Sequence, residues 1–81
     1  MANGDFSRLK PPYHARMRIT VNGESVSIEA PCTVADLVRQ YPVTGAAAVE
    51  VNEALVPKRE HPEHELADGD TVEIVTLVGG G

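Results

Sequence analysis

Residues 18–29 read Arg-Ile-Thr-Val-Asn-Gly-Glu-Ser-Val-Ser-Ile-Glu. Polar and apolar residues alternate on both sides of Asn22-Gly23, a pair that favours a two-residue turn between antiparallel strands. The stretch therefore predicts a β-hairpin with one face for a core and one for solvent. Four residues are expected on the core face: Ile19, Val21, Val26 and Ile28.

A short helix is predicted directly after the hairpin. Thr33 suits the N-cap, and Asp36, at the third helical position, supplies the carboxylate form of a capping box. Cys32 and Leu37 occupy the two positions of a hydrophobic staple. Apolar residues recur at helical spacing as far as Tyr41, and the proline that follows ends the pattern. Because so short a helix is not stable alone, we expect it to lie across the sheet.

The rest of the chain predicts further strands at residues 46–52 and 71–78. Between them lie a short apolar piece, Leu55-Val56, and a charged loop at 58–65 that we expect to be irregular. This order predicts an α+β fold of the ubiquitin-like β-grasp type. It is a mixed sheet of about four or five strands with one main helix across one face. The first and last strands are expected to be central, parallel neighbours.

The chain ends in Gly79-Gly80-Gly81. Glycine has no Cβ, so such a tail is flexible and narrow enough to thread into the active site of another protein. The Gly81 carboxylate would then be a substrate. We expect Gly79 and Gly80 to let the chain pass through a narrow channel.

The last predicted strand becomes apolar on both faces as it approaches this tail. Its second face carries Val75 and Leu77, and Val78 follows them. Two interpretations are open: a central strand buried on both faces, or an exposed apolar patch that docks a partner. On the second interpretation Val75, Leu77 and Val78 are the docking residues.

Charge and composition exclude several functions. The 81 residues carry a formal net charge of −5, and residues 17–81 hold four basic against eleven acidic residues. Such a domain is a poor nucleic-acid binder and suits a basic protein partner. No apolar run is long enough to span a membrane, and a single cysteine excludes an internal disulfide. We expect a cytosolic (cytoplasmic) protein.

Three segments are expected along the chain. Residues 1–16 show neither helical nor strand periodicity and are expected to be a flexible extension, native or an added leader. Residues 17–78 are expected to form the β-grasp domain, and residues 79–81 the flexible tail.

Four motifs resemble the ThiS family of sulfur carrier proteins in thiamin thiazole synthesis. They are Val-Asn-Gly-Glu at 21–24, Thr-Val-Ala-Asp-Leu at 33–37, Val-Glu-Val-Asn-Glu-Ala-Leu-Val-Pro at 49–57, and Leu-Ala-Asp-Gly-Asp-Thr-Val-Glu-Ile-Val at 66–75. The glycine tail completes the match, and together the motifs cover residues 17–81. Their order and combination, more than any single motif, carry the resemblance.

The resemblance implies a protein substrate and sulfur carrier, not an enzyme. A ThiF-type enzyme would use ATP to adenylate the Gly81 carboxylate. Sulfur from a cysteine desulfurase would then replace AMP to leave a thiocarboxylate. A ThiG-type thiazole synthase would accept the sulfur. Catalytic residues, metal and bound cofactor are not expected within the chain, and the free protein is expected to be a monomer.

Several alternatives stay open. A MoaD-like carrier for molybdopterin synthesis, or a ubiquitin-like modifier, would use the same tail chemistry. A protein interaction module with an inert tail would not, so deletion of Gly80 and Gly81 separates that class from the carriers. His61 and His64 have a spacing that allows metal binding, but Pro62 argues against a helical pair. The hydrophobic staple accounts for Cys32 better than a nucleophilic role does.

Overall fold

The computed structural model describes residues 15–41 and 46–77, and its first element is the predicted hairpin. Asn22 and Gly23 have φ angles of 50° and 87°. Positive values at both central residues are what a two-residue turn matched to the strand twist requires. The hairpin prediction is therefore confirmed, with Val21 and Glu24 as the pair that closes the turn.

Five strands, one α-helix and one 3₁₀ helix follow one another along the described chain. They are β1 (Ala15–Val21), β2 (Glu24–Ala30), α1 (Val34–Val38), β3 (Ala46–Val51), β4 (Ala54–Val56), η2 (Lys58–Glu60) and β5 (Thr71–Leu77). β1 begins two residues before Met17, the position at which the sequence predicts that the domain starts. The helices of the described residues are too short to cross a membrane.

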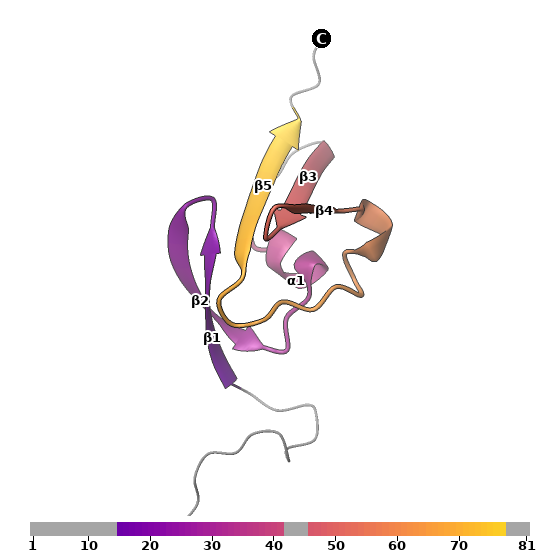
Figure 1. Ribbon diagram of the computed structural model, residues 1–81. Helices are drawn as coiled ribbons and strands as arrows, with labels where there is room; N and C mark the ends of the chain where they lie inside the picture. Colours follow the sequence, from indigo (N-terminus) through magenta and orange to yellow (C-terminus); the bar gives the residue numbers. More distant parts are fainter. Residues whose placement is uncertain (1–14, 42–45, 78–81) are drawn as a thin grey trace, which may run out of the picture.

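The sheet has the strand order β2-β1-β5-β3-β4 (Figure 1). β1 and β5 are parallel neighbours at its centre, and the other pairs are antiparallel. This is the mixed sheet that the sequence predicts, with the first and last strands side by side. The β-grasp prediction is confirmed.

The core lies between the sheet and α1. Its least exposed side chains come from both layers: Ile19, Val34, Leu37, Val49 and Val72 are each at most 1% exposed. Successive residues of a strand point to opposite faces, so the residues that alternate with these face away from α1. One face of the sheet is covered by the helix, and the other is open.

The helix is capped as predicted but is shorter than expected. The Thr33 side chain accepts from the Asp36 amide at 3.1 Å, and the Asp36 carboxylate accepts from the Thr33 amide at 3.1 Å. The α-helix ends at Val38 and does not reach Tyr41. Its last bonds run from Gln40 to Leu37 and from Tyr41 to Val38, a tighter spacing than that of an α-helix. Turns of this kind are common at the ends of α-helices.

The prediction of an irregular loop at 58–65 is wrong in part. Residues 58–60 form η2, and Glu65 makes an isolated antiparallel bridge with Thr33. His61, expected in a solvated loop, is only 9% exposed. Its ring Nε2 lies 3.0 Å from the Val56 carbonyl oxygen, which can only accept, so Nε2 carries the proton. This buried hydrogen bond holds the segment against the domain.

Candidate functional site

Two turn asparagines fix the strand that leads to the C-terminal tail. Asn22 donates its amide to the Val72 carbonyl at 2.9 Å, and its side-chain oxygen accepts the Ile74 amide at 2.8 Å. Asn52, in the β3–β4 turn, likewise accepts the Thr71 amide at 2.9 Å and donates its own amide to Thr71 at 2.7 Å. The sequence indicates turns at these asparagines but not their contacts with β5. The asparagine side chains of both turns thus add hydrogen bonds to the backbone of β5.

The C-terminal half of β5 continues beyond its parallel neighbour. β1 is paired with β5 only at Thr71 and Val72, whereas β3 accompanies β5 as far as Leu77, opposite Ala46. Figure 1 shows β5 extending past the β1–β2 hairpin. After the Asn22 side chain, the β1 side of β5 meets no further strand within the described residues. An open backbone edge therefore lies directly before the tail.

The open face of the sheet carries two exposed apolar side chains, one on β5 and one on β4. Val75 is 48% exposed, which fits the predicted docking patch better than burial on both faces. Leu55 on β4, which the sequence analysis did not single out, is 63% exposed. Its alternation with buried Val56 is the signal that could have indicated this exposure. Leu77 lies in the β3–β5 ladder, and Val78 and Gly79–Gly81 lie outside the described residues.

Two carboxylates lie beside these apolar side chains. Glu50 on β3 is directly opposite Glu73 on β5 and also opposite Leu55 on β4. Like charges at directly opposed positions are destabilising, so this pair does not help the fold. The two carboxylates give the open face a negative potential around the exposed apolar side chains. Such a surface suits a partner with basic groups. We call this surface, made of Ala48, Glu50, Leu55, Glu73 and Val75, the open-face patch.

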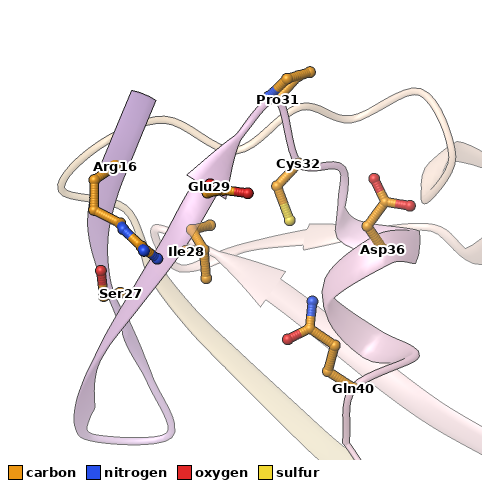
Figure 2. Close-up of a pocket in the computed structure, with 8 residues that line it drawn as sticks. All are labelled: Arg16, Ser27, Ile28, Glu29, Pro31, Cys32, Asp36 and Gln40. Carbon is orange, nitrogen blue, oxygen red and sulfur yellow. The ribbon is translucent and has the colours of Figure 1, made fainter. Parts of the chain in front are cut away.

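A groove between β2 and α1 contains the single cysteine. Figure 2 shows the Cys32 sulfur directed into the space between the Ile28 side chain on β2 and the helix, which carries Asp36 and Gln40. Burial raises the pKa of the Cys32 thiol, and the Asp36 carboxylate raises it further. A thiol that is harder to deprotonate is a poor nucleophile. The groove borders the end of β2 and start of β1, away from the end of β5.

The two histidines do not form a metal centre. His61 is committed to the Val56 carbonyl, and the described residues contain no group of three or more His, Cys, Asp or Glu side chains placed to hold a metal. Of the predicted docking residues, Val75 is the one whose side-chain burial the structure describes, and it is exposed.

Fold and surface together define a ubiquitin-like β-grasp protein whose central strand leads directly into a glycine tail. Comparison with known proteins gives the family: the model of the ThiS family matches residues 13–81. The chain belongs to the ThiS family.

Individual relatives agree with this assignment. The chain is 30% identical over 66 residues to the sulfur carrier protein ThiS of Escherichia coli, a match that covers 80% of this chain and 100% of that protein. It is 38% identical over 66 residues to a thiazole synthase of Paramagnetospirillum magneticum, covering 80% of this chain but 20% of that protein. The crystal structure of the thiamine biosynthesis protein (ThiS) from Geobacter metallireducens superposes with a TM-score of 0.67 at 29% identity, covering 80% and 100% of the two chains.

Proposed function

We propose that this protein is a sulfur carrier for thiamin thiazole synthesis, in which the sulfur is held on the C-terminal carboxylate of Gly81. The chain acts as a protein substrate and carrier, and its partner enzymes supply the catalysis. The observation that carries the proposal is the position of the glycine tail. In the sequence the tail follows on β5, a strand that has an open edge beyond Ile74 and contributes Glu73 and Val75 to the open-face patch.

The first step is activation of the carboxylate. A carboxylate is a poor acyl electrophile, because its negative charge repels nucleophiles and it has no good leaving group. A ThiF-type enzyme overcomes this with ATP: the Gly81 carboxylate oxygen attacks the α-phosphorus, and pyrophosphate leaves. The product is an acyl adenylate. Gly79 and Gly80 allow the chain to enter the narrow site in which this reaction occurs.

The second step introduces sulfur. The terminal sulfur of a persulfide from a cysteine desulfurase attacks the acyl carbon, and AMP leaves. A thiol then cleaves the sulfur–sulfur bond, becomes part of a disulfide and leaves the thiocarboxylate on Gly81. This sulfur is nucleophilic yet tethered, so it reaches a ThiG-type thiazole synthase without release of free sulfide.

The open-face patch supports docking on the activating enzyme. Leu55 and Val75 offer apolar contact on the open face of the sheet, while Glu50 and Glu73 favour a basic counterpart. The open edge of β5 beyond Ile74 offers backbone hydrogen bonds to an incoming chain. The relative from Paramagnetospirillum, a thiazole synthase of which one fifth matches this chain, supports a thiazole synthase as the sulfur acceptor.

Intact-mass measurement tests the proposal. The protein is incubated with a ThiF-type enzyme, ATP, a cysteine desulfurase, cysteine and a thiol reductant. We expect a mass gain equal to the replacement of one oxygen by one sulfur, mapped to Gly81 by fragmentation. The gain should be absent without ATP and absent from a chain that lacks Gly80 and Gly81.

The control is a second carrier on which the same activating enzyme is known to be competent. If that carrier gains sulfur and this chain does not, the sulfur-carrier proposal is wrong. The protein is then better described as an interaction module with an inert tail. If sulfur is gained but a ThiG-type enzyme does not accept it, the carrier chemistry stands and the thiazole branch is wrong.

A further inference from the structure

A second pocket, unrelated to the tail, lies between α1 and the segment that follows β4. It has a volume of about 510 Å³, within the range of ligand-binding clefts. Its apolar lining residues are Ala35, Val38, Tyr41 and Pro62, and His61 also lines it. Ala35 and Val38 are three residues apart and so lie on one side of the helix.

Hydrogen bonds hold the two walls of this pocket together. The Ala35 amide donates to the His61 carbonyl at 3.0 Å, and the Val34 amide donates to the His64 carbonyl at 2.9 Å. The His61 ring is in turn fixed to the Val56 carbonyl. The N-terminal turn of α1 and the segment after η2 therefore form one unit. The pocket is formed without an occupant, so binding need not order its walls.

The charge of the pocket is opposite to that of the protein. Its two charged lining residues are Arg39 and Lys58, and no acidic residue is among those that line it in the described part of the chain. Arg39 forms an ion pair with Asp36, in which the guanidinium nitrogen lies 2.9 Å from the carboxylate oxygen. Lys58 makes no ion pair with any described residue. The protein as a whole has a net charge of −5, so a pocket lined by two basic side chains and several apolar ones differs in charge from the rest of the molecule.

The pocket and the open-face patch lie on opposite sides of the sheet. α1 covers the face toward which Val49 and Val72 point, whereas Val75 and Leu55 alternate with buried residues and point away from it. A partner seated beside α1 would therefore leave the open-face patch and the edge of β5 accessible.

We infer that this pocket is a docking site for a protein segment that presents one aromatic or large aliphatic side chain flanked by carboxylates. The side chain packs against the apolar lining residues, and the carboxylates approach Lys58 and Arg39. The inference does not depend on the sulfur chemistry. It adds a second interaction surface that can be occupied while the tail is being modified.

The test is an NMR titration of the ¹⁵N-labelled full chain with a blocked peptide, acetyl-Asp-Asp-Phe-Asp-Asp-amide. We expect saturable shifts of the Ala35, Val38 and Tyr41 amides at millimolar peptide. Replacing the peptide's phenylalanine by glycine should remove the shifts, and replacing its aspartates by lysines should remove them as well. Both the apolar and the acidic parts of the ligand are thereby tested.

A matched pair of variants locates the site. Lys58→Glu should weaken binding by about tenfold, because one favourable charge contact becomes a repulsive one. Arg59→Glu makes the same charge change one residue away, at an exposed position that does not line the pocket, and should bind like the unchanged protein. Lys58→Gln serves as a milder variant if Lys58→Glu alters the spectrum outside the pocket.

Three results would overturn the inference: no saturable shift at the pocket residues, equal binding of the lysine peptide, or equal loss in Lys58→Glu and Arg59→Glu. The last would mean that only the overall field of the protein acts on the peptide. None of these results bears on thiocarboxylate formation, which the mass measurement tests separately.

Discussion

The side-chain oxygen of Asn22 accepts the backbone amide of Ile74 at 2.8 Å, across 52 positions of the chain. It does so at the point where β1 has ended and β5 still continues. An asparagine with a positive φ therefore has two roles: it forms the hairpin turn, and it takes the place of the missing strand residue beside β5.

Asn22→Gly should separate these two roles. Glycine keeps the positive φ of the turn but removes the side-chain acceptor, so we expect a loss of about 1 kcal/mol of unfolding free energy. Hydrogen exchange of the Ile74 amide should become faster, whereas Asn22→Asp, which keeps an acceptor oxygen, should retain protection. Unchanged exchange at Ile74 in the glycine variant would show that this hydrogen bond is unimportant.

Thr33→Ala should destabilise the domain by about 1 kcal/mol, because the Asp36 amide at the start of α1 loses its acceptor. Urea unfolding measures the change, with Thr76→Ala as a control at an exposed position outside the helix. If both variants unfold at the same midpoint, the cap does not contribute to stability.

The same cap should make stability depend on pH. Hydrogen bonds from the Thr33 backbone and side chain, and then from Arg39, lower the pKa of Asp36. A carboxyl group with a lower pKa in the folded state stabilises the protein above its unfolded pKa, and this contribution is lost as the pH falls through the folded pKa. Unfolding midpoints of the unchanged protein should therefore fall more steeply at acidic pH than those of Asp36→Asn. Parallel pH profiles would contradict this.

Val75→Lys and Leu55→Lys should slow adenylation by a ThiF-type enzyme while changing the unfolding free energy by less than about 0.5 kcal/mol. Each places a charge in the apolar part of the open-face patch, where both side chains are exposed. Ser27→Lys is the matched control, because it adds the same charge on exposed β2, away from the end of β5. Pyrophosphate release gives the rate, and equal rates in all three variants would exclude the patch from docking.

His61→Ala should cost about 2–3 kcal/mol, since it leaves the Val56 carbonyl without its donor and removes a buried ring. His64→Ala, at a half-buried position three residues away, should cost much less. Thermal unfolding of the two variants makes the comparison. Similar melting temperatures would mean that the His61 contact is not a main anchor of the segment.

Much of the fold could be predicted from local patterns. Asn22-Gly23 indicated the hairpin because positive φ angles suit those residue types, and Thr33 with Asp36 indicated the cap because both act within one turn. The end of α1 was predicted too late, because the apolar spacing continues to Tyr41 while the hydrogen bonds tighten after Val38, a change that periodicity does not reveal. The burial of His61 could not be predicted, because its partner is a backbone carbonyl and carries no sequence signal.

The candidate site could be predicted only in part. Val75 could be singled out because an apolar residue in the polar phase of a strand is unusual. Its side chain is exposed, and its docking role stays a prediction. Leu55 was missed because its alternation with Val56 is a single step in a three-residue strand, which is a weak signal. The pairing of Glu50 with Glu73 depends on the register between β3 and β5, which strand patterns alone do not specify.

The direction of β5 has a mechanical consequence. A pull on the C-terminus acts along the strand, so the hydrogen bonds to β3 and β1 are loaded sideways and together rather than opened one after another. The side chains of Asn52 and Asn22 accept hydrogen bonds from the two opposite edges of β5, so these bonds also oppose movement of β5 along its own axis. On the proposed function, in which an enzyme draws in the tail, this geometry would let the domain bear that pull without unravelling from its C-terminal end.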